Sequence, residues 1–226
     1  MKRHTYVLPF GGNCPLVAEQ LGSLRRRLRG GLLLLLLFSS CKKGDDSSDF
    51  YPNVVTEFAT IKTDAAGTMI EFTTDDKRTY TISNPKSGYK ENYKYRAVCG
   101  YVPDGQTAKL YNATGAYMLH DSTALAYEPD ATGAVSVWQS GRYINMQLSP
   151  LTQGGTQYWG YRIDGISGTT THITLHHRQN GDPLSYTQTV YASILIDEFK
   201  TVPAGDNIAV HIKTFDGDKV WTFKKP

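Results

Sequence analysis

The segment NIAVHIKTFDGDKVWTF, residues 207–223, places two strand-like runs on either side of a short turn signal. Ile208, Val210 and Ile212 occupy every second position of the first run, which is the period of a β-strand with one buried face. The Asp-Gly pair at 216–217 suits a tight turn, because glycine adopts positive φ without steric cost. The segment therefore predicts a β-hairpin, and related patterns recur along the chain.

From residue 53 onward, short runs rich in Val, Ile, Thr, Tyr and Phe are separated by Gly, Asp, Asn and Pro clusters, which is an all-β pattern. Five strands with one longer connection, residues 84–92, predict a small OB-like barrel over residues 53–122. Its candidate strands are Asn53–Thr63, Thr68–Thr74, Arg78–Ser83, Tyr93–Val102 and Gln106–Tyr111.

A turn-rich stretch, residues 121–133, separates this barrel from a second group of strands and predicts a domain boundary. Seven strands over about 100 residues predict an antiparallel β-sandwich covering residues 123–226. Its candidate strands are Ala134–Trp138, Tyr143–Ser149, Gln157–Asp164, Thr171–Arg178, Tyr186–Asp197, Asn207–Phe215 and Lys219–Lys224.

Residues 1–40 have the order of a secretory signal. Arginines at 25–29 precede six consecutive leucines and then Ser39-Ser40, which is a basic, apolar and small-residue succession. The apolar block is too short to span a bilayer, which takes about 20 residues. We therefore expect residues 1–40 to be removed from the mature protein.

Cys41 follows the small residues directly, so that Phe38-Ser39-Ser40-Cys41 resembles a bacterial lipobox. The resemblance implies that Cys41 is lipidated and becomes the first residue, with residues 41–52 as a flexible tether; ordinary cleavage with free release is the alternative. Asp45-Asp46 in the tether resembles a surface-export signal of bacterial lipoproteins. We therefore expect attachment to the outer membrane through the lipid on Cys41, with exposure at the cell surface.

The charge of the chain argues against nucleic acid as a partner. The formal charge of +3 comes from residues 1–40, which hold six basic residues and one acidic residue, and the remainder carries 18 basic and 20 acidic residues. The barrel region, residues 53–122, holds eight of each sign. Single-strand binders need a basic groove, so we expect no nucleic-acid partner.

Few side chains in the sequence indicate a catalytic or metal-binding role. Cys99 lies on the less charged face of a predicted strand and is expected to be a buried thiol. On one strand, His172 and His176 would stand about 13 Å apart, at about 3.3 Å per residue, so they predict solvated histidines rather than a metal site. We find no catalytic residue and predict no metal or cofactor.

The aromatic residues leave ligand binding open. Trp138, Trp159 and Trp221 lie in predicted strands and are expected to fill a core, whereas Tyr158, on the face opposite Trp159, is a candidate for an exposed contact. The sequence does not identify a ligand-binding residue.

Several segments of the chain, taken in order, resemble those of the NigD-like lipoproteins of Gram-negative anaerobes. These segments are the lipobox, YPNVVTEFATIKT, YKENYKYRAVCGYV, SVWQSGRYINMQL, ITLHHRQNGD with YASILID, and IKTFDGDKVWTF. The resemblance covers nearly all of residues 41–226. It implies an N-terminal OB-like domain and a C-terminal β-sandwich. The family has no established biochemical role and supplies no catalytic residue.

The triplet Asp121-Ser122-Thr123 resembles an O-glycosylation acceptor of such bacteria, with Ser122 as the modified residue. It falls in the predicted linker between the two domains, where an acceptor would be accessible.

These features predict a non-enzymatic protein of the cell envelope that acts in binding or assembly, with a protein or a glycan as its ligand. One alternative is an envelope hydrolase or an accessory to one, because a fold alone does not exclude a site. Another is a structural subunit that adds strands to its neighbours, which an exposed edge strand would favour.

We predict that Cys41→Ser gives an unprocessed precursor without lipid, because serine lacks the thiol that carries the acyl chain. Labelling of cells with a fatty-acid probe, followed by detergent partitioning, measures this. A Cys99→Ser variant serves as the control and should be labelled normally. Unchanged labelling of Cys41→Ser would contradict the lipoprotein prediction.

Overall fold

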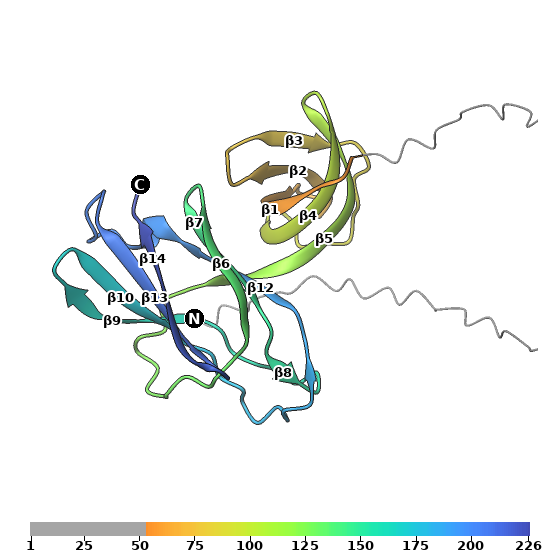
Figure 1. The fold of residues 1–226 in the computed structure, drawn as a ribbon. Helices are drawn as coiled ribbons and strands as arrows, with labels where there is room; N and C mark the ends of the chain where they lie inside the picture. Colours follow the sequence, from red (N-terminus) through yellow and green to blue (C-terminus); the bar gives the residue numbers. More distant parts are fainter. Residues whose placement is uncertain (1–52) are drawn as a thin grey trace, which may run out of the picture. The chain divides into compact units, whose positions relative to one another are not determined.

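The structure is a computed structural model that describes residues 53–226; the signal segment, Cys41 and the tether to residue 52 lie outside the described residues (Figure 1). The described part is all-β, with one short 3-10 helix, Ile196–Glu198. Its strands are β1 (Val55–Thr63), β2 (Met69–Thr74), β3 (Thr79–Ile82), β4 (Lys94–Asp104), β5 (Thr107–Leu119), β6 (Ala134–Ser140), β7 (Tyr143–Leu148), β8 (Leu151–Thr152), β9 (Tyr161–Ser167), β10 (Thr170–Leu175), β11 (Tyr186–Thr187), β12 (Val190–Leu195), β13 (Asn207–Thr214) and β14 (Gly217–Lys224).

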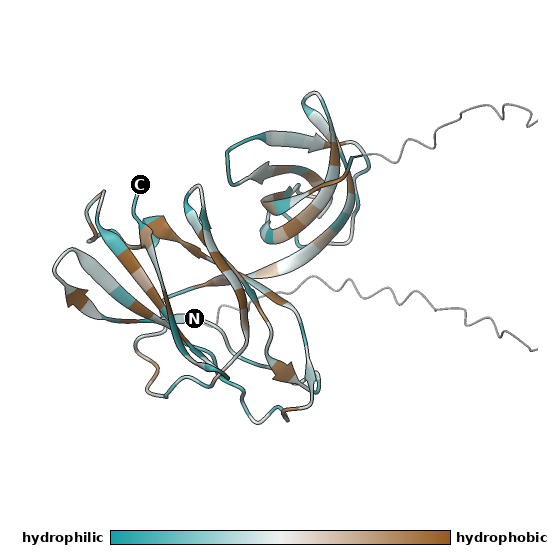
Figure 2. Cartoon of the chain, in the orientation of Figure 1, coloured by the Kyte–Doolittle hydropathy of each residue, from teal (hydrophilic) through white to brown (hydrophobic). Residues whose placement is uncertain are grey.

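Strands β1 to β5 form the OB-like barrel that the sequence predicts. β1 pairs with both β2 and β4, and β3 pairs with β2 and, in parallel, with β5, so the five strands close on themselves. Alternation places one side of each strand inside, as the apolar bands in Figure 2 show. The large buried side chains at its centre include Ile61, Met69, Phe72 and Tyr101.

Strand β5 belongs to two sets of strands. Its first part pairs with β4 in the barrel, and Ala116–Leu119 pairs in parallel with β12. Through this pairing the barrel strands continue into an eight-stranded sheet with the order β3-β2-β1-β4-β5-β12-β7-β6. The thirteen residues of β5 are therefore the covalent and hydrogen-bonded link between the two hydrophobic cores.

The second core lies between the β12-β7-β6 part of this sheet and a separate four-stranded sheet with the order β14-β13-β10-β9. Ile144, Met146 and Ile194 come from the first sheet, and Ile173 and Val210 come from the second. All five are fully buried, which is the packing of a β-sandwich.

The all-β fold with a barrel and a sandwich is confirmed, and the pairing differs in two places. We expected a wholly antiparallel sandwich, yet β12 pairs in parallel with the end of β5, and β10 pairs in parallel with β13. Parallel neighbours need a long crossover, and here the chain between them passes through β12 of the opposite sheet. The predicted hairpin is present, with Thr214 opposite Gly217, whose φ is 103°.

The tryptophans match the prediction in part: Trp138 and Trp221 lie in strands, whereas Trp159 lies in the loop before β9. Trp159 and Trp221 are partly buried against the sandwich core, and Trp138 contacts the ring of Phe58 edge-on at 5.4 Å. Tyr158 is 51% exposed. No helix among the described residues is long and apolar enough to cross a membrane.

A buried cation joins the barrel to the sandwich strands. Arg96 of β4 pairs with Asp75, in the turn between β2 and β3, with Nη1 2.6 Å from Oδ1. Its Nε donates to Ser193 Oγ of β12 at 3.0 Å, and its Nη2 donates to Asn145 Oδ1 of β7 at 2.9 Å. The ring of Tyr143 lies 3.8 Å from the guanidinium carbon. Arg96 is therefore bound by residues from both halves of the described chain.

The network is buried, and its amide, hydroxyl and carboxylate groups also bond to one another. Asp75 Oδ1 and Arg96 Nη1 meet as an ion pair and make no hydrogen bond. Asn145 donates through Nδ2 to Asp75 Oδ2 at 2.7 Å, and Ser193 donates to Asn145 Oδ1 at 2.7 Å. The side chains of Arg96 and Asp75 are 2% and 3% exposed. Charges removed from water at this level are tolerated when each is paired and hydrogen-bonded.

The placement of a domain boundary at residues 122–123 stays a prediction.

We predict that Arg96→Met lowers the free energy of unfolding by about 3–5 kcal/mol, because it leaves the buried carboxylate of Asp75 without its cation. Urea denaturation followed by circular dichroism measures this. Arg78→Met is the matched control, since the Arg78 side chain is 47% exposed and its ion pairs contribute about 0–1 kcal/mol. Equal losses in the two variants would contradict the assigned role of Arg96.

Candidate functional site

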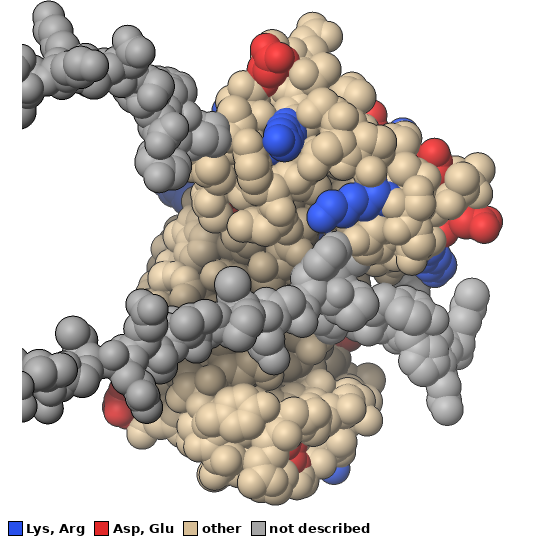
Figure 3. All heavy atoms as spheres, turned by 90° about the vertical axis from the view of Figure 1, so that its right-hand side faces the viewer, with Lys and Arg blue, Asp and Glu red and all other residues tan. Residues whose placement is uncertain are grey.

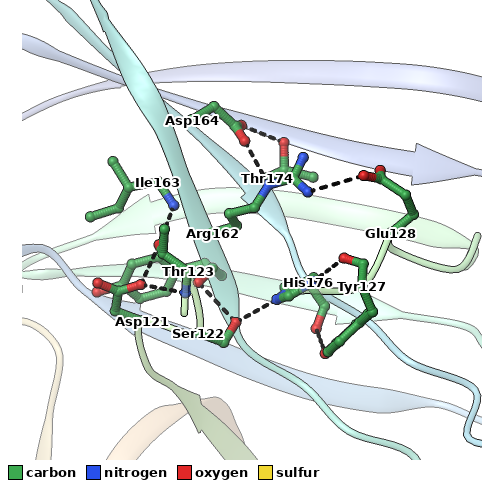
Figure 4. A network of polar contacts seen from close by, with 11 residues as sticks. Asp121, Ser122, Thr123, Tyr127, Glu128, Arg162, Ile163, Asp164, Thr174 and His176 are labelled. Carbon is green, nitrogen blue, oxygen red and sulfur yellow. Dashed lines mark hydrogen bonds and ion pairs between the residues drawn. The ribbon is translucent and has the colours of Figure 1, made fainter. Parts of the chain in front are cut away.

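A polar network covers the edge of the four-stranded sheet (Figure 4). Strand β9 is an edge strand, and the segment after β5 lies alongside its first residues. Ser122 N–H donates to Tyr161 O at 2.8 Å, and Tyr161 N–H donates to His120 O at 3.1 Å. Thr123 Oγ1 accepts the Ile163 N–H at 2.9 Å. The backbone groups at the start of this edge, Tyr161 to Ile163, are therefore satisfied, which opposes pairing with another chain over that part of β9.

Ser122 and His176 make the central contact of this network. Ser122 Oγ lies 2.7 Å from His176 Nδ1, and His176 Nε2 lies 2.8 Å from Tyr127 O. Because a carbonyl only accepts, Nε2 carries a hydrogen; in the neutral ring, Nδ1 then accepts the Ser122 hydroxyl hydrogen. The Tyr127 ring stacks on the imidazole at 3.8 Å between centroids, with 15° between planes.

This serine–histidine contact supports a structural role better than a hydrolytic one. His176 is fully buried, and its Nε2 donates to a backbone carbonyl rather than to a carboxylate. A general base must exchange protons with a substrate or water within hydrogen-bond reach. The pair instead links the chain after β5 to the end of β10.

Glycosylation of Ser122 stays a prediction; its hydroxyl also lies 3.0 Å from Tyr161 O.

The same network extends onto the outer face of β9 and β10. Asp164 accepts from Arg162 Nε at 2.9 Å and from Thr174 Oγ1 at 2.6 Å, and Arg162 lies 3.7 Å from Glu128 (Figure 4). The Arg162 and Asp164 side chains are partly exposed and Glu128 is almost fully exposed, so water screens their ion pairs.

A shallow depression of about 380 Å³ lies between two loops of the sandwich part. Three neutral polar side chains, three glycines, one carboxylate and one proline line it: Gln153, Gly154, Gly155, Thr156, Asn180, Gly181, Asp182 and Pro183. Asp182 is the one ionisable residue of this lining. The first four belong to the loop between β8 and β9, and the others to the loop between β10 and β11. Glycine occupies three of these positions, so exposed backbone and not side chains forms that part of the lining.

Asp182 holds these two loops together. Its carboxylate accepts from Thr152 Oγ1, from Gln157 Nε2 at 2.9 Å, and from the backbone N–H groups of Gln153 at 3.0 Å and Gly155 at 3.1 Å. The Thr152 hydroxyl, followed by the other donors, lowers the pKa of Asp182 from its ordinary value of 3.8 to about 2. All four bonds are internal, so the carboxylate shapes the depression and is not free for a ligand.

The approach of the loops requires glycine at position 155. A Cβ there would lie 2.7 Å from Asp182 Oδ1, closer than any side chain tolerates. At the rim, the Tyr186 hydroxyl would lie 3.7 Å from a Cβ on Gly154, and the Tyr186 side chain is 55% exposed. An aromatic ring thus stands beside a polar, open depression.

The sequence did not identify this site, because Asp182 lies in a loop without a recognisable motif and Tyr186 begins the two-residue strand β11. Tyr158, which it singled out, is exposed as predicted and belongs to the same region, since its N–H donates to Arg178 O at 2.9 Å. The donors around Asp182 come from residues 25 to 30 positions earlier in the chain.

The histidines differ from expectation. We expected solvated strand histidines, but His176 and His177 are fully buried, with the His177 ring stacked on Trp159 at 4.1 Å. Burial lowers the pKa of His177. His172 is half-buried and contacts His211, which lies on another strand. Within residues 53–226, no three His, Cys, Asp or Glu side chains gather as a metal site.

Cys99 is buried in the barrel core, as predicted. Burial raises the pKa of its thiol to about 12, so the thiolate is not available at neutral pH. The Cys41 prediction lies outside the described residues.

The surface carries both charge signs. On the face drawn in Figure 3, Lys and Arg side chains are scattered among Asp and Glu, and most of the described surface is uncharged. This face therefore offers no continuous basic surface of the kind that follows a phosphate backbone.

Solved structures of Bacteroides proteins share this fold. A NigD-like immunity protein from Bacteroides caccae is 23% identical over 77% of this chain and 93% of its own, with a TM-score of 0.58. A protein of unknown function from Bacteroides vulgatus is 15% identical over 76% and 91%, with the same TM-score. A Bacteroides fragilis protein named as a lipoprotein is 12% identical over 77% and 99%, with a TM-score of 0.57.

No family model matches the chain, and no curated protein matches it. At these identities the structures show a common fold and nothing further. The resemblance to NigD-like proteins is confirmed in that sense, since the described chain has the fold of the Bacteroides caccae protein along most of its length.

We predict that Asp182→Asn lowers the melting temperature at pH 7, because an amide oxygen cannot replace a carboxylate that accepts four hydrogen bonds. The folded-state pKa of Asp182 is depressed, so its contribution is present above about pH 4 and is lost as the pH falls towards 2. The difference between wild type and variant should therefore shrink over that range. Thermal melts from pH 7 to pH 2.5 measure this.

Asp216→Asn is the control for this experiment, because Asp216 lies in an exposed turn and should leave the profile unchanged. A wild-type advantage over Asp182→Asn that is as large at pH 2.5 as at pH 7 would contradict the assigned role of the carboxylate.

Proposed function

We propose that this protein is lipid-anchored at Cys41 in the cell envelope and binds an uncharged glycan in the depression between the β8–β9 and β10–β11 loops. The observation that carries the proposal is the exposed ring of Tyr186 beside a depression lined by neutral polar side chains and glycine backbone.

The chemistry of the depression suits a sugar. Ligand sites combine apolar or aromatic surface with a few placed polar groups, and a sugar ring offers an apolar C–H face and a rim of hydroxyls. The amides of Gln153 and Asn180 and the hydroxyl of Thr156 can each donate to or accept from a hydroxyl. The ring of Tyr186 supplies an apolar face with a polar tip.

The charge of the depression determines whether a neutral or an anionic saccharide fits it better. Gln153, Thr156 and Asn180 are neutral, and the carboxylate of Asp182 is occupied by four internal donors. No cation lines the depression to compensate an acidic sugar. An uncharged saccharide therefore fits better than an anionic one.

The location and anchoring rest on the sequence. The basic, apolar and small-residue order before Cys41 supports lipidation, and the acidic tether supports the outer membrane with exposure at the cell surface. A glycan-binding module on a tether at that surface would meet extracellular saccharides. The immunity role in the name of the Bacteroides caccae protein belongs to that protein.

Among the alternative functions, strand addition to a neighbouring protein has the most support from the fold. β14 is an edge strand, and Val220 within it is 53% exposed. Lys219 and Lys224 lie at either end of the apolar stretch, however, and charged lysines on an edge oppose pairing with another strand. The depression therefore supports a function better than this edge does.

We predict that the detergent-purified mature protein binds neutral saccharides on a glycan array, and that Tyr186→Ala weakens the binding about tenfold, which corresponds to about 1.4 kcal/mol. Isothermal titration with the best saccharide from the array measures the affinity. Tyr111→Ala is the matched control, because Tyr111 is 44% exposed but lies on the barrel, and it should bind as wild type does.

Equal affinity for Tyr186→Ala and wild type would place the ligand elsewhere. A protein partner recovered from intact envelopes that still binds Tyr186→Ala, together with an array on which no saccharide binds, would replace the glycan by a protein ligand.

A further inference from the structure

Two histidines from different strands meet on the outer face of the four-stranded sheet. His172 Nδ1 lies 3.0 Å from His211 Nε2. The ring centroids are 5.2 Å apart with 41° between the planes, so the rings meet through their nitrogens and do not stack. Both side chains are half-buried, so they are held by their neighbours and still accessible to solvent.

The strand pairing fixes this contact. β10 and β13 are parallel neighbours in the middle of the sheet, with His172 opposite Ala209 and Thr174 opposite His211. The two histidines are therefore diagonal neighbours on one face. Ile173 and Val210 alternate with them and are fully buried on the other face, which fixes the direction of both imidazoles.

We propose that His172 and His211 form a binding site for a divalent transition-metal ion, with Cu²⁺ as the ion that fits best. Neutral imidazole is the commonest nitrogen ligand for such ions in proteins. In the metal-free pair, one ring donates its N–H to the lone pair of the other. When a metal ion binds, the donating ring changes tautomer: its hydrogen moves through solvent to its other ring nitrogen, both rings stay neutral, and the ion accepts the lone pairs of the two facing nitrogens.

The separation of the nitrogens favours a particular coordination geometry. With metal–nitrogen bonds of about 2.0–2.1 Å, nitrogens 3.0 Å apart subtend about 91–97° at the metal. That is the cis angle of a square-planar or tetragonal site, which Cu²⁺ and Ni²⁺ adopt, and it is smaller than a tetrahedral angle. Cu²⁺ also binds nitrogen ligands most tightly among the first-row divalent ions.

Small movements complete the site. The χ2 torsion of histidine is broad, so both rings can turn their lone pairs towards a common point without moving the strands. Because the described residues supply no third His, Cys, Asp or Glu, water fills the remaining positions. The bound ion therefore keeps exchangeable positions.

The test uses the mature protein purified in detergent and CuCl₂ as the probe. We expect one Cu²⁺ per chain in a titration, an electron paramagnetic resonance spectrum with coupling to two imidazole nitrogens, and at least tenfold weaker binding by His172→Gln or His211→Gln. His120→Gln is the matched control, since His120 is exposed and contacts Glu198 at 3.2 Å on another element, and it should bind Cu²⁺ as wild type does.

A second measurement needs no variant. In ¹H–¹⁵N spectra of the wild-type protein, paramagnetic Cu²⁺ should first broaden the signals of residues around 172 and 211. Broadening that begins around His120 would overturn the proposal, as would a wild-type Cu²⁺ isotherm that coincides with those of His172→Gln and His211→Gln. Neither result depends on whether the protein binds a glycan.

Discussion

The buried charge of Arg96 is the constraint on which the arrangement of strands depends. A guanidinium that is almost fully removed from water is stable only while its donors are satisfied, and here the acceptors come from three separate parts of the chain. Asp75 belongs to the barrel, whereas Asn145 and Ser193 belong to the strands that continue its sheet. A register slip of one residue in β7 or β12 would move these acceptors to the opposite face of the sheet. The network therefore specifies pairing as well as contributing to stability.

The two candidate sites share a principle of construction. Asp182 draws together loops that precede and follow the β9–β10 pair, and the histidine pair joins β10 to a strand reached only after a crossover. In both, a rigid β scaffold places polar groups that are far apart in sequence. The depression is open and polar, whereas the histidine pair lies on a sheet face, so the two sites can act independently.

The period of the side chains predicted most of the fold. Alternating sets such as Ile208, Val210 and Ile212 gave strands within a few residues of those observed, because a half-buried strand leaves a strong signal. The length of β5 and its second partner were missed, since residues 112–119 contain Gly115 and two alanines and carry little alternation. Parallel pairing was also missed, because it depends on which distant strands meet and not on any local pattern.

The same limit applies to the sites. Tyr158 was recognisable because its neighbour Trp159 fixed the buried face of a strand. His172 and His176 were considered together because they lie four residues apart, yet the partner of His172 is His211, which lies 39 residues away. His176 and His177 were misjudged because they come after β10 has ended, where alternation no longer holds. The spacing of residues along one strand does not predict a contact between residues of two different strands.

The dual membership of β5 has a consequence for the order in which the protein assembles. Every strand that β1 to β4 require lies before residue 120, so a chain that emerges N-terminus first can complete its barrel early. If the barrel forms first, only Asp75 pairs with Arg96 at that stage, because Asn145 and Ser193 come later in the chain. Ser193 arrives almost a hundred residues later. Burial of the cation would then be a late, dehydrating step of folding.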